Sequence, residues 1–233
     1  MDKKEFINAL NDLGIIINDS QLNQLDEYYK LLIEYNKHTN LTRITEEKEV
    51  YLKHFYDSVT LFKSVKLDNQ SLIDIGTGAG FPGLVLKIIF PNLKVTLLDS
   101  LNKRIMFLKE VIEKLNLKDI NCVHARAEEY IKEKRESYDI VTSRAVANLQ
   151  ILSELCIPYV KVNGLFIPMK ADSNLEINDS ISTINKLGGQ IEDIIVFELP
   201  KSAGKRTLIK IKKSVKTNSK YPRKFNEIKK KPL

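Results

Sequence analysis

The chain has 233 residues, of which 43% are hydrophobic and 29% charged, and its formal net charge is +7. This length and composition fit one substantial globular core with room for a small appendage. No run approaches about 18 uninterrupted apolar residues and no signal-peptide core is present, so we expect a cytoplasmic protein without a membrane segment. Cys122 and Cys156 are too few for a disulfide framework or a zinc site, and we expect buried, inert thiols and no bound metal.

The first 65 residues are predicted to be helical. We expect helices over 5–13 and 46–63, and between them a longer helix capped by Asp19 or Ser20. The middle helix carries apolar side chains at helical spacing: Leu22, Leu25, Tyr29, Leu32 and Tyr35.

From residue 71 onward the pattern changes to alternating strands and helices. Strands are predicted at 71–75, 94–98, 120–124, 138–142, 164–169, 191–198 and 206–211, with helices at 82–90, 101–116, 126–135, 147–158 and 174–187. Such alternation indicates a parallel sheet with helices on both faces. The connection over 200–205 is too short for a helical crossover, so the last strand should be antiparallel to its neighbour. A mostly parallel seven-stranded sheet with one antiparallel strand is the Rossmann-like fold of class I methyltransferases rather than of dehydrogenases.

A glycine-rich turn follows the first predicted strand. Gly76, Gly78, Gly80 and Gly83 come directly after the apolar run, and Pro82 suits the first position of the next helix. Glycines at such a turn let the backbone bend sharply and let a ligand approach closely. Asp99 ends the next strand 21 residues after Gly78, where an acidic side chain meets the hydroxyls of a bound ribose.

Two nucleotide cofactors fit this turn. Residues 78–83 satisfy the G-x-G-x-x-G pattern of dinucleotide-binding proteins, so an NAD-dependent oxidoreductase is an open alternative. Asp74, however, lies in the strand just before the glycines, where we expect its carboxylate to face the ligand. A carboxylate there would repel a pyrophosphate and attract the ammonium group of S-adenosylmethionine. The pattern therefore favours the methyl donor.

Four segments should converge at the carboxyl ends of the strands, where open α/β sheets bind ligands. They are 74–81 for the methionine part and the approach to the ribose, Asp99 and Ser100 for the ribose hydroxyls, 125–128 for the adenine edge, and 143–145, just past the strand at 138–142. Each segment also has a purely structural interpretation. Glu128 could be an ordinary helix N-terminal charge, Arg144 could pair with Asp139, and Asp99 could cap a helix.

The residues after the fourth strand limit the methyl acceptor. The chain has neither the Asn/Asp-Pro-Pro-Tyr/Phe motif of exocyclic-amine methyltransferases nor a cysteine placed as a nucleophile. An acceptor that is already nucleophilic, such as guanine N7, needs no general base, and catalysis then depends on alignment. The spacing of His38, His54 and His124 does not suggest metal ligands, and we interpret them as structural.

The basic excess is confined to the C-terminus. Residues 212–233 hold nine Lys/Arg against one acid, whereas the remaining 28 basic and 29 acidic residues leave a charge of −1. Two interpretations stay open: a solvated terminus that aids solubility, or an arm that binds nucleic acid, with Tyr221 and Phe225 stacking on bases. The candidate RNA-binding residues are Lys220, Arg223, Lys224, Lys229 and Lys230.

Seven ordered segments resemble the bacterial small-subunit rRNA guanine-N7 methyltransferase G family, also known as the glucose-inhibited division protein B family. They are 35–42, 54–58, 76–83, 98–104, 127–129, 143–145, and 221–224 with the terminal 231–233. This resemblance implies N7 methylation of one guanine in the 530 loop of 16S rRNA, near the decoding site, with S-adenosylmethionine as cofactor. It also implies cofactor contacts at Gly76, Phe81, Ala127, Glu128 and Arg144.

Arg144 is the residue that we expect to be catalytic. The expected partner is 16S rRNA, within the 30S subunit or an assembly intermediate, and the expected state is a monomer. We expect a helical extension over 1–65, a methyltransferase domain over 66–212 and a basic tail over 213–233. A non-catalytic RNA-binding or ribosome assembly factor is the second alternative, although such a protein would not need the glycine turn and Asp99.

Overall fold

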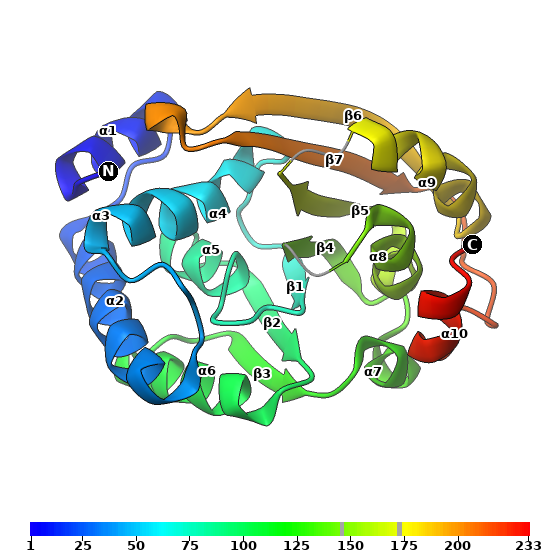
Figure 1. Cartoon of the computed structure of the whole chain (residues 1–233), viewed down its shortest axis with the longest axis horizontal. Coiled ribbons are helices and arrows are strands. Elements are labelled where there is room, and N and C mark those ends of the chain that lie inside the picture. The colour runs from blue at the N-terminus through cyan, green and yellow to red at the C-terminus, as the bar shows by residue number, and fades with distance from the viewer. Residues whose placement is uncertain (145–146, 172–173) are drawn as a thin grey trace.

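A seven-stranded sheet forms the centre of the part of the chain that the structure, a computed structural model, describes: residues 1–144, 147–171 and 174–233. The strands lie in the order β3-β2-β1-β4-β5-β7-β6 (Figure 1). Their bounds are β1 (Ser71–Ile75), β2 (Lys94–Asp99), β3 (Ile120–His124), β4 (Tyr138–Arg144), β5 (Val160–Lys170), β6 (Gly189–Glu198) and β7 (Lys205–Lys213). The predicted sheet is confirmed.

The reversed strand is β7. It lies between β5 and β6 and is antiparallel to both, with Phe166 opposite Ile211 on one side and Ile195 opposite Leu208 on the other. A short 3₁₀ turn at Pro200–Ser202 links β6 to β7, which is too little chain for the crossover that a parallel pair requires. The expected antiparallel pairing of the last two strands is confirmed.

Helices connect the parallel strands as predicted, with small shifts at their ends. They are α5 (Gly83–Ile89), α6 (Asn102–Lys114), α7 (Ala127–Lys134), α8 (Leu149–Cys156) and α9 (Asn174–Lys186). Pro82 is the residue before the first helical position of α5 and not that position itself. After α8 the chain tightens into a 3₁₀ turn at Ile157–Tyr159, because Pro158 cannot continue an α-helix.

The N-terminal region is helical, as predicted. It contains α1 (Lys3–Asp12), α2 (Asp19–Thr39) and a continuous run of α3 (Glu47–Val50), a π-helical segment (Tyr51–Tyr56), α4 (Asp57–Val59) and a 3₁₀ turn (Thr60–Lys63). The predicted cap of α2 is wrong by one residue. Asn18 is the cap, because its side chain accepts from Gln21 N at 2.9 Å while Gln21 Oε1 accepts from Asn18 N.

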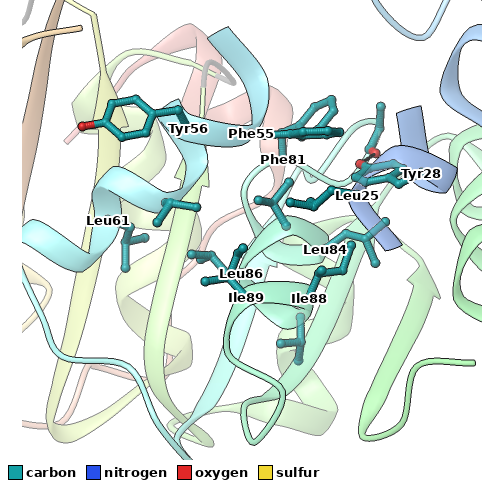
Figure 2. Packing of buried hydrophobic residues seen from close by; sticks show 14 of the residues in the cluster. Leu25, Tyr28, Phe55, Tyr56, Leu61, Phe81, Leu84, Leu86, Ile88 and Ile89 are labelled. Atoms are coloured by element: carbon teal, nitrogen blue, oxygen red, sulfur yellow. Dashed lines mark hydrogen bonds between the residues drawn. The ribbon is translucent and has the colours of Figure 1, made fainter. Parts of the chain in front are cut away.

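The N-terminal helices share one hydrophobic core with the helix that follows the glycine turn. Leu25 and Tyr28 of α2 and Phe55 of the π-helical segment pack around the side chains of α5, such as Leu84 (Figure 2). Gln21 at the start of α2 donates to the carbonyls of Ile88 and Ile89, both at 2.9 Å, near the end of α5. These contacts fix the N-terminal helices beside the glycine turn.

The C-terminal segment is folded onto the body of the protein. It ends in α10 (Phe225–Lys230), which lies near α7 and α8 in Figure 1. Tyr221 is 4% exposed and Ile228 is fully buried. The guanidinium of Arg223 forms two hydrogen bonds with the buried carboxylate of Glu154, at 2.8 and 2.6 Å. The interpretation of this segment as a solvated terminus is therefore wrong.

Among the described residues, no helix is long and apolar enough to cross a membrane.

Candidate functional site

A cavity of about 470 Å³ opens at the carboxyl ends of β1 to β4. The four predicted segments meet there, and residues of the N-terminal helical region and of the C-terminal segment complete the wall. Eight of the nine predicted cofactor-binding residues line it: Gly76, Gly78, Phe81, Asp99, Ser100, Ala127, Glu128 and Arg144.

The glycine turn connects β1 to α5, lines the cavity and is hydrogen-bonded to the end of β2. Gly76 N donates to the Leu98 carbonyl at 2.8 Å. Gly78 has φ +63°, and a Cβ placed there would meet nothing within 4 Å, so this glycine leaves open space on the cavity side. Gly83, in contrast to Gly78, is closely packed against the sheet. Its Cβ would lie 2.5 Å from Leu97 Cδ2, so only glycine lets α5 approach the sheet this closely.

Asp74 has a different position from the predicted one. Its side chain is fully buried and does not line the cavity. One carboxylate oxygen accepts from Gly83 N at 2.9 Å and from the Thr77 hydroxyl at 2.7 Å. Burial raises the pKa of this carboxyl to about 6, against the lowering by those two hydrogen bonds. Asp74 therefore links the start and the end of the glycine turn on its buried side, and its carboxylate does not face the cavity.

Asp99 lies where the sequence predicts, at the end of β2 and in the cavity wall. Its carboxylate is 3% exposed and accepts from Gly78 N at 2.9 Å, from Leu101 N at 2.9 Å and from Arg104 Nη1 at 3.1 Å. The predicted capping role is thus present in part, since Leu101 precedes α6. The same carboxylate is a candidate for holding a ribose, because an acidic residue at the end of this strand meets the ribose hydroxyls in Rossmann-type folds.

Glu128 is in the first turn of α7 and lines the cavity with Ala127. Its contact to Arg126 Nη1 is long, at 3.9 Å, so the carboxylate is only weakly engaged. The preceding carbonyl of Ala127 accepts from the Tyr159 hydroxyl at 2.6 Å, which fixes the backbone at the start of the helix.

Arg144 ends β4, and its side chain points to the N-terminal helical region. Its Nη1 donates to Asp57 Oδ2 at 3.0 Å and to the Lys53 carbonyl at 3.2 Å, and the guanidinium lies 5.2 Å from the centre of the Phe81 ring. The alternative pairing of Arg144 with Asp139 is wrong, because Asp139 binds Lys161 and Ser71 instead. Ala145, the last residue of this predicted segment, lies outside the described residues.

Asp57 and Arg206 do not line the cavity but form an ion cluster with Arg144, which does, and sequence reasoning missed both. The second oxygen of Asp57 accepts from Arg206 Nε at 2.9 Å, so one buried carboxylate joins two arginines from β4 and β7. The cluster keeps one net positive charge next to the cavity. The only sequence signal was the segment 54–58, which resembles the family but belongs to no cofactor motif.

His54 was interpreted as structural, yet it lines the cavity. Its ring stacks on Phe81, with ring centres 4.3 Å apart, and its Nε2 lies 2.8 Å from the Thr42 hydroxyl. Burial, reinforced by the charge of Arg144, lowers the pKa of His54 to about 3. The imidazole is therefore neutral at physiological pH.

The cysteines do not contribute a nucleophile. Burial raises the pKa of Cys122 to about 12 and that of Cys156 well above its usual range. Both thiols are free; Cys156 is buried as predicted, whereas Cys122 is only partly buried. Within the described ranges, no cluster of His, Cys, Asp and Glu is arranged to hold a metal ion.

The C-terminal segment contributes one side chain to the cavity. Phe225 lines it, and Arg126 lies 5.9 Å from the centre of that ring. Two expectations for this segment are corrected. Tyr221 is buried and has no free face for a base, and Arg223 is bound to Glu154 rather than directed outward. Lys220, Lys224, Lys229 and Lys230 are exposed.

Two solved structures share this fold. A SAM-dependent methyltransferase from Aquifex aeolicus matches with a TM-score of 0.56 at 15% identity, over 74% of this chain and 96% of that one. TYW2 of M. jannaschii, solved in complex with AdoMet, matches with a TM-score of 0.55 at 16% identity, over 67% of this chain and 76% of the other. The architecture is that of a class I S-adenosylmethionine-dependent methyltransferase.

A narrower assignment follows from the sequence comparisons. The model of the GidB family, rRNA small subunit methyltransferase G, matches residues 21–206. A ribosomal RNA small subunit methyltransferase G from Acetivibrio thermocellus is 49% identical over the full length of both chains. The chain belongs to the rRNA small subunit methyltransferase G family.

Proposed function

We propose that this protein transfers the methyl group of S-adenosylmethionine to N7 of a guanine in the 530 loop of 16S rRNA, near the decoding site. The observation that carries the proposal is the cavity, in which the glycine turn, Asp99, Glu128 and Arg144 meet at the carboxyl ends of β1 to β4. Family membership over residues 21–206 supports the same substrate.

The cavity residues fit the parts of this cofactor. The open backbone at Gly78 takes the methionine part, the Asp99 carboxylate takes the ribose hydroxyls, and Ala127 and Glu128 take the adenine. When bound, the cofactor supplies an electrophilic methyl group on a sulfonium. Asp99 Oδ2 accepts from Gly78 N and Arg104 Nη1 and so holds the turn in shape, whereas Oδ1 accepts only from Leu101 N and keeps one lone pair for the ligand.

The polar groups at the Arg144 side of the cavity suit an acceptor that needs no general base. Arg144 is a permanent cation, and His54 has both ring nitrogens within hydrogen-bond distance of protein groups. Guanine N7 has an in-plane lone pair and loses no proton on methylation, so alignment with the methyl group is sufficient.

The chemistry of N7 methylation limits which group Arg144 can contact. Methylation leaves a cationic guanine, so a guanidinium beside N7 would raise the barrier. We propose that Arg144 grips an anionic group, the cofactor carboxylate or a phosphate, or donates to guanine O6, and so orients the reacting atoms.

Exposed lysines of the C-terminal segment would hold the rRNA. We propose that Lys220, Lys224, Lys229 and Lys230 contact phosphates of 16S rRNA, within the 30S subunit or an assembly intermediate, and that a cytoplasmic monomer binds it. Arg223 is left out of this set because Glu154 holds its guanidinium.

The test is methyl transfer from labelled S-adenosylmethionine to 30S subunits whose 16S rRNA lacks the modification. Mass-spectrometric mapping should find one added methyl on N7 of one guanine in the 530 loop. Thermal shift measurements should show stabilisation by S-adenosylhomocysteine and none by NAD. Cofactor binding without methyl transfer to any 16S nucleotide would instead indicate a non-catalytic factor.

A further inference from the structure

Two segments of this chain resemble the family yet contribute nothing to the cofactor motifs. They are 35–42, at the end of α2 and the loop after it, and 54–58, in the π-helical segment and α4. The structure brings them together at the cavity, where Leu41, Thr42 and His54 form the wall beside Phe81 and Arg144. This part of the wall comes from the N-terminal helical region, whereas Asp99 and Glu128 come from β2 and α7, so it is the part left for the methyl acceptor.

The loop that carries Thr42 is held rigidly although it lies on the surface. The Asn36 side chain binds both polar backbone groups of Thr42: its Nδ2 donates to the Thr42 carbonyl and its Oδ1 accepts from Thr42 N, both at 2.9 Å. The hydroxyl of Tyr29 donates to the Thr45 carbonyl at 3.1 Å. Such preorganisation of a loop is expected where one side chain must meet a ligand in a fixed geometry.

The hydrogen bonds of His54 determine which of its nitrogens carries the proton. Arg144 Nη2, which can only donate, lies 3.3 Å from His54 Nδ1. The Lys53 carbonyl is also 3.2 Å from Nδ1, and although it accepts from Arg144 Nη1, its second lone pair could accept a proton carried on Nδ1. A proton on Nδ1 would also face the hydrogens of Arg144 Nη2, whereas a lone pair on Nδ1 accepts from them, so we assign the proton of the neutral ring to Nε2. His54 therefore donates to the Thr42 hydroxyl oxygen at 2.8 Å.

The Thr42 hydroxyl is consequently restricted to one role. Its oxygen accepts from His54 Nε2 and, at 3.1 Å, from Ile44 N. A hydroxyl has two acceptor lone pairs and one donor hydrogen. With both lone pairs occupied, the hydroxyl hydrogen is the group that is left to bind a ligand in the cavity.

We propose that the Thr42 hydroxyl donates a hydrogen bond to O6 of the target guanine, and that His54 is a positioning residue that keeps this hydroxyl a donor. The proposal rests on the function proposed above. On the edge of guanine that presents N7 to a methyl donor, the neighbouring group is the O6 acceptor. Adenine presents an amino donor at the same place, and a hydroxyl with no free lone pair cannot accept from it. Thr42 would thus discriminate guanine from adenine.

The decisive variant is Thr42→Val, which keeps the shape of the side chain and removes the hydroxyl. With 30S subunits as substrate, kcat/KM should fall about 10- to 100-fold, the range for a lost hydrogen bond to a substrate group. The affinity for S-adenosylhomocysteine should stay within about twofold of wild type, and Thr42→Ser should recover most of the activity. Thr45→Val, in the same loop and with an exposed side chain, is the matched control and should behave as wild type.

A substrate analogue separates recognition of O6 from a structural effect. In 30S subunits reconstituted with 2-aminopurine at the target position, N7 is present and O6 is missing. With this analogue, kcat/KM of the wild-type protein should fall by about the same factor by which kcat/KM of Thr42→Val falls with guanine. The variant should show no further fall in kcat/KM with the analogue. Coupling of this kind is what a direct contact predicts.

Several results would overturn the proposal. A kcat/KM of Thr42→Val close to that of wild type would do so. Losses in kcat/KM that add up when the variant is tested with the analogue would also do so. Loss of S-adenosylhomocysteine binding by Thr42→Val would assign Thr42 to the cofactor instead. If wild-type protein itself fails to methylate 16S rRNA at N7, the proposed function fails first, and the two failures remain distinguishable.

Discussion

Asp57 Oδ2 lies 3.0 Å from Arg144 Nη1, and this buried ion pair connects the N-terminal helical region to the end of β4. The other oxygen of Asp57 binds Arg206, so two cations depend on one carboxylate that is 3% exposed. Removing that carboxylate leaves two guanidiniums without their counter-charge.

Asp57→Asn should therefore destabilise the protein markedly. Loss of one member of a buried ion pair costs about 3–5 kcal/mol, and we expect a free energy of unfolding lower by about 3 kcal/mol. Urea unfolding measures the difference. Glu34→Gln, which breaks an exposed pair with Lys37 on α2, is the control and should change stability by less than about 0.5 kcal/mol. A loss below about 1 kcal/mol for Asp57→Asn would mean that solvent screens the cluster.

Arg144→Ala should lower methyl transfer to 30S subunits by at least about 100-fold, because misalignment of the reacting atoms has effects of this size. The variant should remain folded, since Asp57 keeps its bond to Arg206. Arg144→Lys should recover little activity, because lysine cannot reproduce two donors from one rigid plane. Circular dichroism checks the fold and single-turnover assays measure the rate.

The affinity of Arg144→Ala for S-adenosylhomocysteine identifies which group Arg144 holds. Normal affinity with slow turnover would favour guanine O6 or a phosphate, whereas weak affinity would favour the cofactor carboxylate. Methylation at near wild-type rate by the folded variant would remove Arg144 from the mechanism.

Local patterns were enough to predict the sheet and most of the residues that line the cavity at the strand ends. Strands, the glycine turn and Asp99 are each encoded within a few neighbouring residues, and the position of parallel strand ends then brings them together. The orientation of Asp74 could not be predicted in this way. In a sheet covered on both faces, alternation of side chains does not distinguish a buried carboxylate from one that faces the ligand.

Contacts between residues far apart in the sequence were not predictable. Arg206 and Asp57 are 149 positions apart, and Arg223 and Glu154 are 69 apart. Neither pair has a periodicity or a motif that would connect its members. The basic composition of the C-terminus suggested an arm in solution, but the buried partners of Arg223 and Ile228 are visible only in the folded chain.

Asp99→Ala should weaken cofactor binding. On the proposed binding mode it removes a charge-assisted hydrogen bond to the ribose, worth roughly 1.5–3 kcal/mol, or about 10- to 150-fold in affinity. The carboxylate also holds Gly78 N at 2.9 Å, so the shape of the turn should suffer as well. Isothermal calorimetry with S-adenosylhomocysteine measures the effect, and Asp193→Ala on the edge strand β6 is the control. Equal affinities for wild type and Asp99→Ala would leave Asp99 only a structural role.

The exposed lysines of the C-terminal segment should account for part of the salt dependence of RNA binding. Replacing Lys220, Lys224, Lys229 and Lys230 by Gln should reduce the slope of log K against log salt by up to about 3.6, at about 0.7 to 0.9 per lost phosphate contact. Cofactor affinity should not change. Deleting the segment is a poorer test, because Tyr221 and Ile228 are buried.

A charge-matched control for this experiment replaces four exposed lysines elsewhere: Lys4, Lys30, Lys109 and Lys118. This control should keep the wild-type slope. If the two quadruple variants have the same slope, the C-terminal lysines do not contact RNA specifically.

His54 should make stability depend on pH in acid. Its ring faces the Arg144 guanidinium, the Thr42 hydroxyl, the Lys53 carbonyl and Phe81, and its pKa in the folded protein is lowered to about 3. In the unfolded chain the ring binds a proton below about pH 6.5. The unfolded state therefore holds more protons between about pH 3 and 6.5, and the stability present above that window is lost as the pH falls.

His54→Phe should remove this contribution while preserving the stacking on Phe81. The slope of unfolding free energy against pH, measured by urea unfolding between about pH 4.5 and 6, should be lower in the variant by up to about 1.4 kcal/mol per pH unit. Asp74 contributes with the opposite sign, because its raised pKa makes stability fall as the pH rises from about 4 to about 6. The contribution of Asp74 is common to wild type and His54→Phe and cancels when their slopes are compared. A constant cost of leaving Arg144 Nη2 without His54 does not change the slope. Parallel slopes for wild type and His54→Phe would mean that the folded protein binds a proton at His54 as readily as the unfolded chain does, and the assignment of a neutral ring would have to be abandoned.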